Sequence, residues 1–371
     1  MMEPWGEFKK KVLIVGEFPT KLDDNRGAVL NDKFGKLLQN TLEKYGLDLE
    51  RDCLVTSALK CHPGKLSKKL SYEVNCCRRF LMQVIDERMP KVIIALGEYA
   101  VTSLISHRWK KDFGTINKWR GWAIPDQDFK AWICPTFAPS MIYDKDEEYF
   151  TVWEQDLHQA IEHISKSFPV WKEPEIDYIT DLKVLRKIEP YQNMVAIDYE
   201  STGIKPDAPG HRLVCASVAD TPDHAFVFMF PPTKKERLPY LELLTNPAIL
   251  KLAQNMKYEH IWSLVKLRKE IVGWAWDSML ASHIMDNREG VTGLKFQTYV
   301  QFGLVDYSSE IDPYLKSVEA NNANALNRIF DLIETKEGAQ KLMKYCAMDT
   351  ITQYRLSLLQ QERMNYSFLP F

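Results

Sequence analysis

Short apolar runs alternate with amphipathic segments through the first part of the chain. The runs at 11–17 (KVLIVGE) and 52–61 (DCLVTSALKC) have the length and the β-branched content of buried strands. The segments 33–46 and 71–89 instead repeat apolar residues with helical spacing, and Gly46 is a stop signal for the first of them. This alternation predicts an α/β domain with a parallel sheet and helices on both faces. The pattern continues with a strand, a glycine turn and a helix at 90–105, and a further strand and loop at 131–140.

The pattern changes after residue 164. The stretch 167–178 carries two prolines, which indicates a linker or the entry into a second domain. A second α/β region follows, and functional groups in such folds gather beyond the carboxyl ends of the strands. Its strands are expected at 194–200 (MVAIDYE), 213–220 (LVCASVAD) and 224–230 (HAFVFMF), and helices are expected from about 237 onward.

The chain length of 371 residues is too great for one ordinary core and suits two domains, which we place at residues 1–165 and 175–371. Hydrophobic residues make up 45% and charged residues 26% of the sequence, as in ordinary globular proteins. No apolar run approaches the roughly 20 residues of a membrane-spanning helix. The N-terminal sequence also lacks the pattern of a signal peptide. Seven scattered cysteines fit a reducing cytoplasm better than a disulfide framework, so a cytoplasmic location without membrane contact is expected.

Charge is balanced over the whole chain, with 48 basic and 50 acidic residues. A global positive field that attracts nucleic acid is therefore excluded, and any such contact requires local patches. Two candidates are KLSKKL at 65–70 and RWKKDFGTINKWR at 108–120, the second with interleaved aromatic residues. They are either phosphate contacts or ordinary solvated faces.

The strand at 195–203 (VAIDYESTG) ends with two carboxylates one residue apart. Alternate residues of a strand share a face, so Asp198 and Glu200 point the same way. Two like charges at this spacing repel each other unless a cation lies between them. The alternative is a strand that simply ends in a solvated turn.

Two later segments repeat polar residues four positions apart. AQNMKYEHIW places Asn255 and Glu259 on one face of an expected helix, and MKYCAMDTITQYRL places Tyr345 and Asp349 on another. Each pair alone is typical of a solvated stripe. The order of a strand with DxE, a helix with NxxxE and a helix with YxxxD is more informative.

This order resembles the 3′–5′ proofreading exonuclease domain of family-A DNA polymerases, a member of the DEDDy exonucleases. The motifs DYEST, QNMKYEH and YCAMD match in sequence, with WDSMLASHIMD between the last two, over roughly residues 175–365. The resemblance implies an RNase H-like domain that hydrolyses phosphodiesters with two Mg²⁺ or Mn²⁺ ions. The implied metal ligands are Asp198, Glu200, Glu259 and Asp349, with Tyr345 orienting the attacking water and Asn255 and Thr202 contacting substrate.

One residue departs from the family pattern, because Glu259 replaces the usual Asp. The extra methylene moves its oxygens by about 1 Å, and such a shift can cost about 10²-fold in rate. Asp277 is interpreted as a helix cap or as a support for the metal ligands rather than as a ligand itself. Tyr258, Trp262 and Phe296 are candidates for stacking against bases, although each is also typical of a core.

The first domain resembles the iron–sulfur class of uracil-DNA glycosylases. VLIVGEFP, VTSALKCHPG, PKVIIALGEYA, KWRG and PTFAPSM match its motifs over roughly residues 8–165. The implied fold is a three-layer αβα domain. Cys61 and Cys77 fit two of the family's four cluster cysteines, but no cysteine precedes Cys53, so a four-iron cluster is not expected. In a rearranged site, Cys53 and Cys76 would have to supply the other two ligands.

The glycosylase motifs have lost their chemical groups. Ser57 stands where the family has Asn, Leu30 where it has a stacking Phe, and Ala138 where it has a His. Ala138 cannot donate a proton or stabilise an anion, so uracil excision is not expected. The matching pocket comprises Gly16, Glu17, Pro19, Leu30, Ser57 and Ala138.

The sequence therefore predicts a metal-dependent 3′–5′ DNA exonuclease with a non-catalytic glycosylase-like domain that binds DNA or serves as structure. The expected substrate is a single-stranded or frayed DNA 3′ end. The expected partner is a DNA polymerase domain or subunit, in a phage or bacterial replication and repair system. Two alternatives stay open: a bifunctional glycosylase and exonuclease acting on uracil or a modified base, and a catalytically weak scaffold of a family-A polymerase.

Overall fold

The computed structural model describes residues 2–64, 71–143, 145, 147–317, 319 and 322–365. The chain divides into two compact units, and each contains one sheet covered by helices. The α/β class predicted from the alternating pattern is confirmed. The first unit comprises Met1–Trp171 with Tyr299–Asp306, and the second comprises Lys172–Thr298 with Tyr307–Phe371.

The sheet of the first unit has five strands in the order β2-β1-β3-β5-β4. Its first four members are parallel, and β4 runs antiparallel to β5 at the edge. Strands β1, β2 and β3 are buried at every residue, as expected for a parallel sheet with helices on both faces. The strands are β1 (Val12–Gly16), β2 (Cys53–Ser57), β3 (Val92–Leu96), β4 (Ile124–Asp126) and β5 (Ala131–Thr136).

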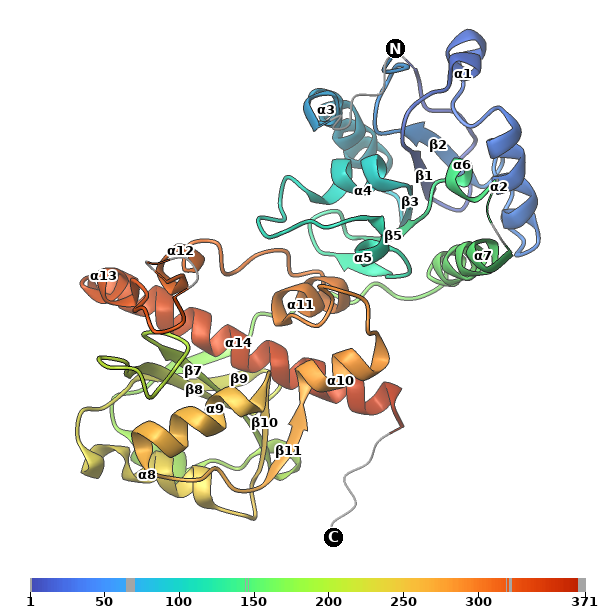
Figure 1. Ribbon diagram of the computed structural model, residues 1–371. Helices are drawn as coiled ribbons and strands as arrows, with labels where there is room; N and C mark the ends of the chain where they lie inside the picture. The colour runs from blue at the N-terminus through green and yellow to red at the C-terminus, as the bar shows by residue number, and fades with distance from the viewer. Residues whose placement is uncertain are drawn as a thin grey trace. The chain divides into compact units, whose positions relative to one another are not determined.

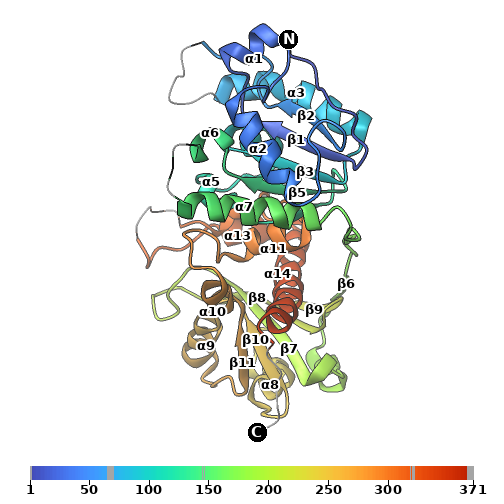
Figure 2. The same cartoon turned by 90° about the vertical axis from the view of Figure 1, so that its right-hand side faces the viewer.

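Helices cover both faces of this sheet, which confirms the predicted three-layer arrangement. Helices α3 and α4 lie on one face, and α2 and α7 lie together on the other (Figures 1 and 2). The helices are α1 (Lys21–Arg26), α2 (Lys33–Glu43), α3 (Ser71–Arg88), α4 (Glu98–Ile105), α5 (Ile116–Trp119), α6 (Pro139–Ile142) and α7 (Glu147–Glu162).

The sheet of the second unit has six strands in the order β11-β10-β7-β8-β9-β6. Strand β8 is antiparallel to both of its neighbours, whereas β7, β10 and β11 are parallel. This mixed sheet is the one expected for an RNase H-like domain. The strands are β6 (Glu175–Tyr178), β7 (Met194–Ser201), β8 (Leu213–Thr221), β9 (His224–Met229), β10 (Leu250–Ala253) and β11 (Trp274–Asp277).

Strand β6 was not predicted, because the segment 167–178 was interpreted as a linker or domain entry. It pairs in parallel with β9 at the edge of the sheet. Three of its four residues are exposed, so the strand has no apolar run that a pattern would reveal.

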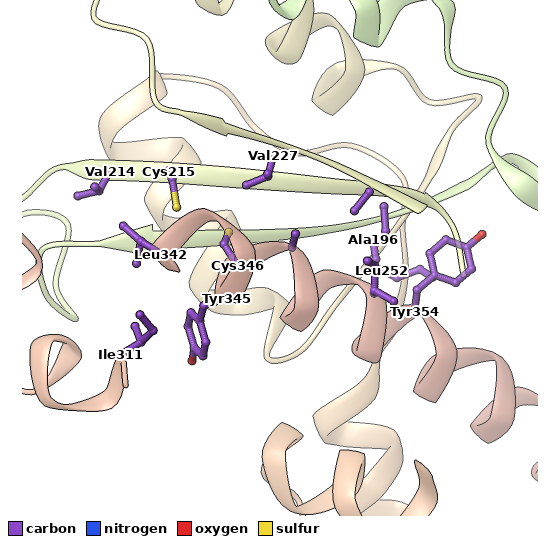
Figure 3. Packing of buried hydrophobic residues seen from close by; sticks show 14 of the residues in the cluster. Ala196, Val214, Cys215, Val227, Leu252, Ile311, Leu342, Tyr345, Cys346 and Tyr354 are labelled. Carbon is purple, nitrogen blue, oxygen red and sulfur yellow. The ribbon is translucent and has the colours of Figure 1, made fainter. Parts of the chain in front are cut away.

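Two apolar clusters lie on the two faces of the second sheet. One packs α14 against β7, β8 and β9 (Figure 3), and the other packs α8 and α9 against the opposite face. The α-helices of this unit are α8 (Lys234–Thr245), α9 (Met256–Trp262), α10 (Ser278–Met285), α11 (Leu294–Phe302), α12 (Asp312–Leu315), α13 (Ile329–Ile333) and α14 (Lys336–Arg363). The short helical turns are η1 (Leu182–Lys187), η2 (Tyr191–Asn193) and the π-helical η3 (Ser263–Leu267).

Helix α14 carries the third predicted motif across the sheet (Figure 1). It begins at the cap Thr335, whose side chain accepts a hydrogen bond from the Gly338 N–H. A Cβ at Gly338 would lie 1.8 Å from the carbonyl oxygen of Leu332, so glycine permits the close approach of α13 and α14. This packing fixes the register in which α14 presents its polar residues to β7.

Across the described ranges, every helix is either too short or too polar to traverse a lipid bilayer.

Candidate functional site

The two carboxylates of β7 lie under helix α14. Asp198 is paired with Ser217 and Glu200 with Cys215 in the β7–β8 ladder. Asp198, Glu200 and Cys346 each offer a ligand atom, and these atoms all lie within 4.8 Å of one another. The strand pair and the helix therefore converge as the motif order predicted.

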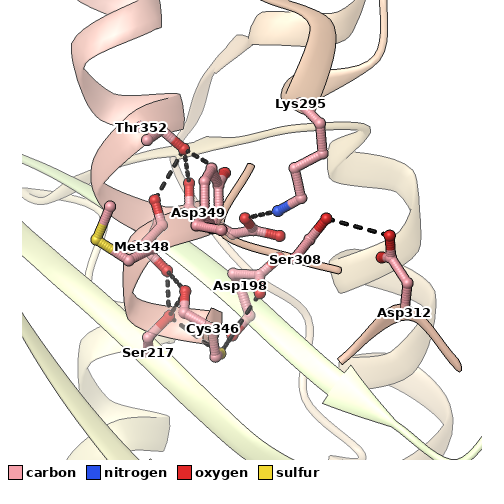
Figure 4. A network of polar contacts seen from close by, with 11 residues as sticks. Asp198, Ser217, Lys295, Ser308, Asp312, Cys346, Met348, Asp349 and Thr352 are labelled. Atoms are coloured by element: carbon pink, nitrogen blue, oxygen red, sulfur yellow. Dashed lines mark hydrogen bonds and ion pairs between the residues drawn. The ribbon is translucent and has the colours of Figure 1, made fainter. Parts of the chain in front are cut away.

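Cys346 was not among the predicted site residues, although it follows Tyr345 directly in YCAMD. Its Sγ lies 3.4 Å from Oδ2 of Asp198 and 3.2 Å from Oγ of Ser217 (Figure 4). A buried thiol is common in a core, so nothing in the local pattern marks this cysteine as a site residue.

Asp349 forms an ion pair with Lys295 of α11 (Figure 4). The Nζ of Lys295 also lies 4.1 Å from the ring centroid of Tyr307 and 4.2 Å from that of Tyr345. Lys295 was not predicted, because no spacing in the segment before the third motif distinguishes it from a solvated lysine. It places a positive charge inside the acidic group.

Glu259 lies in the first turn of α9 and is only 2% exposed. Its Oε2 is buried and has no hydrogen-bond partner among the residues that the structure describes. We expected Asn255 to share a face of this helix with Glu259, but Asn255 lies before the first turn of the helix. It is the N-cap with φ of 65°, because the chain turns there through a left-handed conformation before α9 begins.

Asp277 caps helix α10, in agreement with its interpretation from the sequence. Its side chain accepts hydrogen bonds from the N–H groups of Met279 and Leu280 at the start of α10. It also accepts from the N–H groups of Asn255 and Met256, each at 3.0 Å. The carboxylate thus joins the starts of α9 and α10 and fixes the position of the second motif.

Burial dominates the protonation of the clustered acids. It raises the pKa of Asp198 to about 6, against the opposing charge of Lys295. Burial raises the pKa of Glu200 and of Glu259 well above the usual range, and the negative charge of Asp198 raises both further. Without a cation, Glu200 and Glu259 therefore retain protons that exposed acids would lose at neutral pH, whereas Asp198 is mostly ionised at that pH.

The residues present fit a hard divalent ion. Carboxylate oxygens from β7, α9 and α14 are the ligands that Mg²⁺ and Mn²⁺ prefer. The unpartnered Oε2 of Glu259 and the short separations around Asp198 are costly unless a cation compensates them. Tyr345 completes the group, and burial together with the charge of Glu200 raises its pKa well above the usual range, so its hydroxyl stays protonated.

A pocket of about 210 Å³ opens beside Glu200 and Ser201. Tyr258 lines it, and the hydroxyls of Tyr258 and Ser201 lie 2.6 Å apart. Trp262 and Phe296 are core residues with 0% and 3% exposure, so of the three candidate stackers only Tyr258 reaches this pocket.

Thr202 does not line this pocket with its side chain. It is fully buried, and its hydroxyl accepts a hydrogen bond from the N–H of Arg212 at 2.9 Å. Its expected contact with substrate has no support from this geometry.

The first unit has a pocket of about 190 Å³ at the carboxyl end of β1. Four of the six residues predicted for the glycosylase-like pocket line it, namely Gly16, Glu17, Leu30 and Ala138. Pro19 and Ser57 are not among the lining residues, and the Ser57 hydroxyl donates to the carbonyl of Leu59 at 2.6 Å. Phe34 lines the same pocket and was missed, because it belongs to α2 rather than to a matched motif.

Glu17 is held against the start of α4. The N–H of Tyr99 donates to its Oε1 at 3.2 Å, and a Cβ on Gly97 would lie 2.5 Å from its Cδ. Burial raises the pKa of Glu17 to about 7, despite these backbone donors. Asp23 and Asp32 line the same pocket, but both serve as helix-capping groups of α1 and α2.

The basic stretch 108–120 is mainly structural. Arg108 pairs with Asp126 and Arg120 with the buried Asp156, both in bidentate contacts. Trp109 and Trp119, at 5% and 0% exposure, belong to the core. These side chains are not available to a phosphate backbone. The other candidate patch, 65–70, lies outside the described residues.

The cysteines considered for a metal cluster lie in different surroundings. Cys53 is buried in β2, and burial raises the pKa of its thiol far above the usual range. Cys61 and Cys76 are exposed and Cys77 is half-buried, all as free thiols.

Comparison with known families agrees with the resemblance seen in the first unit. Residues 3–158 match the family model described as the uracil DNA glycosylase superfamily. The type-4 uracil-DNA glycosylase of Sulfurisphaera tokodaii is 31% identical over 137 residues, which cover 36% of this chain and 60% of that protein. The enzyme of the same name from Thermotoga maritima is 28% identical over 162 residues, covering 43% of this chain and 81% of that protein. The chain thus spans about 60% of the length of the first of these relatives.

Comparison with solved structures returned proteins that align with about half of the chain. NrnC of Brucella melitensis bound to pGG has a TM-score of 0.36 at 17% identity, over 52% of this chain and 83% of NrnC. RNase D of Escherichia coli, an exoribonuclease involved in structured RNA processing, has a TM-score of 0.36 at 13% identity, over 52% of this chain and 46% of RNase D. At these TM-scores no functional property is transferred to this chain.

Proposed function

We propose that the second unit is a metal-dependent 3′–5′ exonuclease that removes nucleotides from a DNA 3′ end. The observation that carries this proposal is that Asp198 and Glu200 of β7 lie beside Cys346 of α14, close enough for their charges to act on the buried Glu259 of α9 and on Tyr345. Asp349, one turn after Tyr345 on α14, is proposed as the fourth carboxylate. When bound, a pair of divalent ions lowers the pKa of an attacking water and offsets charge on the leaving oxygen. The four carboxylates hold the pair, and the hydroxyl of Tyr345 orients the water.

Glu259 replaces the Asp that the family resemblance leads one to expect, and its burial bears on what the replacement does. At 2% exposure with one unpartnered oxygen, its carboxylate has few other roles. We propose that it serves as the ligand despite its extra methylene. This favours an active nuclease over a purely structural scaffold.

The first unit, proposed to span residues 1–165, is a glycosylase-like domain without base excision. Ala138 lines its pocket where an acid–base group would be needed, and Ser57 points away from the pocket to the Leu59 carbonyl. We propose that the unit serves as structure or binds DNA without cleaving it, beside a nuclease domain at 175–371. The setting proposed is replication or repair alongside a DNA polymerase in a phage or bacterial cell.

Digestion of end-labelled single-stranded and 3′-overhang oligonucleotides tests the nuclease. With Mg²⁺ or Mn²⁺, a 5′-labelled strand should shorten stepwise and a 3′-labelled strand should release mononucleotide at once. The variant Asp198→Ala, Glu200→Ala should be inactive. A matched variant of two exposed carboxylates in the same unit, Glu270→Ala, Glu289→Ala, should retain activity. Parent protein no more active than the Asp198→Ala, Glu200→Ala variant would refute the proposal.

The same assay with DNA and RNA strands of equal sequence tests the DNA preference. Incubation with a uracil-containing duplex, followed by alkaline cleavage, tests the first unit. We expect no abasic sites above those in an untreated duplex. Uracil release by the full chain would instead establish the bifunctional alternative.

A further inference from the structure

A second, larger hollow of about 490 Å³ lies on the nuclease unit, outside the carboxylate site. Three cations line it, Arg212, Arg237 and Lys266, and no acidic residue is among its lining residues. The aromatic rings of Phe230 and Phe330 stand beside them. We call this hollow the basic groove.

The charges of the basic groove are held in place but are not neutralised. The guanidinium of Arg212 lies 4.1 Å from the ring centroid of Phe330, and that of Arg237 lies 5.1 Å from the ring of Phe230. Arg237 also donates to the carbonyls of Pro231 and Pro232. Within the part of the chain that the structure describes, no carboxylate forms an ion pair with any of the three cations.

Backbone pairing connects the basic groove to the carboxylate site. Leu213, which lines the groove, is the ladder partner of Ser201, and Cys215 is the partner of Glu200. The N–H of Arg212 donates to Thr202, the residue after Ser201. The groove therefore starts where strand β7 ends, immediately beyond the proposed metal ligands.

The cationic and aromatic side chains of the groove indicate which kind of ligand it binds. Unpaired arginine and lysine side chains attract phosphates and release their counterions, whereas exposed rings provide faces on which bases stack. A protein segment rich in acidic residues would satisfy the cations but would place no flat groups beside the half-buried rings of Phe230 and Phe330 and the guanidinium groups next to them. Single-stranded nucleic acid offers both groups in alternation along one chain.

We propose that the basic groove binds the single strand upstream of the 3′ end that enters the carboxylate site. The groove is then a second contact region, which increases affinity for strands long enough to reach it and contributes nothing to a dinucleotide. This inference rests on the proposed exonuclease activity in one respect only: that activity sets the direction in which the strand lies, with its 3′ end toward the carboxylate site. Binding in the groove itself is measurable without hydrolysis.

The test compares two double variants. The groove variant carries Arg212→Gln and Lys266→Gln. The control variant carries Lys183→Gln and Lys187→Gln, which remove two exposed cations elsewhere in the same unit. Both are made in the full chain with the Asp198→Ala, Glu200→Ala background, so that no strand is degraded. Fluorescence anisotropy with a labelled single strand of about twelve nucleotides gives the dissociation constant over a range of salt concentrations. Thermal melts confirm that the variants remain folded.

We expect the groove variant to bind the long strand about tenfold more weakly than its parent, with the slope of log K against log salt reduced by about 1.4 for two lost phosphate contacts. Dinucleotide binding and the control variant should stay within about twofold of the parent. Equal losses for the dinucleotide and the long strand, or no loss for the long strand, would overturn the proposal.

Failure of the groove and failure of the exonuclease give different results. If the protein without the background substitutions digests DNA but the groove variant binds long strands normally, only the groove proposal is wrong. If that protein digests nothing and long-strand binding still depends on Arg212 and Lys266, the groove remains and the exonuclease proposal is wrong.

Discussion

The two units stabilise their buried carboxyl groups in different ways. In the first, Glu17 receives a backbone hydrogen bond from Tyr99, and burial is the main cause that raises its pKa to about 7. In the second, burial raises the pKa values of Asp198, Glu200 and Glu259, and the charge of Asp198 raises those of Glu200 and Glu259 further. A solitary acid is satisfied by becoming protonated, whereas a cluster of acids is best satisfied by a shared cation.

This difference is the basis on which we propose that the first pocket is non-catalytic and that the second site is catalytic. Both units place their polar groups at the ends of strands, as α/β folds generally do. Among the described residues, the second unit brings candidate ligand atoms from strand β7 and helix α14 within 4.8 Å of one another. The two units can therefore be distinguished by removing single groups and by adding metal.

The largest expected effect is on hydrolysis. Asp198→Asn should lower the rate of DNA digestion on the order of 10²- to 10³-fold, because it removes a charge directed at the reacting phosphate. Glu17→Gln should leave the rate unchanged, since Glu17 belongs to the other unit. Quantified gel ladders under single-turnover conditions measure both. A similar loss in the two variants would show that the comparison is wrong.

The next effect is on the pH dependence of stability. Because the pKa of Glu17 is raised in the folded state, its burial costs nothing below the ordinary value of 4.5 and becomes costly as pH rises through about 7. Glu17→Gln removes this penalty, on the order of 3 kcal/mol at pH 8. Calorimetric scans at pH 5 and pH 8 should show the variant gaining stability over the parent only at the higher pH. An equal difference at both values would mean that Glu17 ionises normally.

Metal should stabilise only the second unit. At a concentration of Mn²⁺ about 100 times its dissociation constant, the free energy of unfolding should rise by about 2.7 kcal/mol. The rise should disappear in the Asp198→Ala, Glu200→Ala variant. Hydrogen exchange resolved by peptide separates the units: protection should increase in β7 and α14 and stay constant in β1 and β3. Increased protection in the first unit alone would place the metal site elsewhere.

The smallest effect concerns Lys295, whose ammonium group is paired with Asp349. A bound metal must compete with this internal cation. Lys295→Met should therefore strengthen Mn²⁺ binding by about tenfold, equivalent to about 1.4 kcal/mol. Titration calorimetry without nucleic acid measures the affinity directly. Lys341→Met, at an exposed pair on α14, is the control. Weaker binding in Lys295→Met would mean that the lysine organises the ligands rather than competing with the metal.

Much of this architecture was accessible from the sequence. The central strands β1, β3 and β7 carry apolar runs because they are buried on both faces, and each was predicted. Strand β2 stands at the end of its sheet but is also buried at every residue, and it was predicted for the same reason. The edge strand β6 was missed because exposure removes the apolar signal. The candidate ligands followed from motif order, since alternation in a strand and spacing in a helix fix which residues share a face.

Other features depended on contacts between distant segments. Asn255 was expected within a helix, but the turn that joins β10 to α9 places it in a left-handed cap held by Asp277. Cys346 and Lys295 enter the site only because α14 and α11 pack beside β7, and nothing in their local sequence marks them. The positive charges at 108–120 were a candidate nucleic-acid contact in the sequence. In the structure, Arg108 and Arg120 pair with carboxylates supplied by other segments.

The sequence alone determined which residue types stand at the ends of the strands and which faces they share, because backbone periodicity is a local property. It also placed Ala138 at the position where the glycosylase resemblance leads one to expect a histidine. Only the tertiary structure decided which acids come close enough to need a common cation, and which cations are already paired. Electrostatic interactions depend on distance and burial, and both are set by packing between segments that lie far apart in the chain.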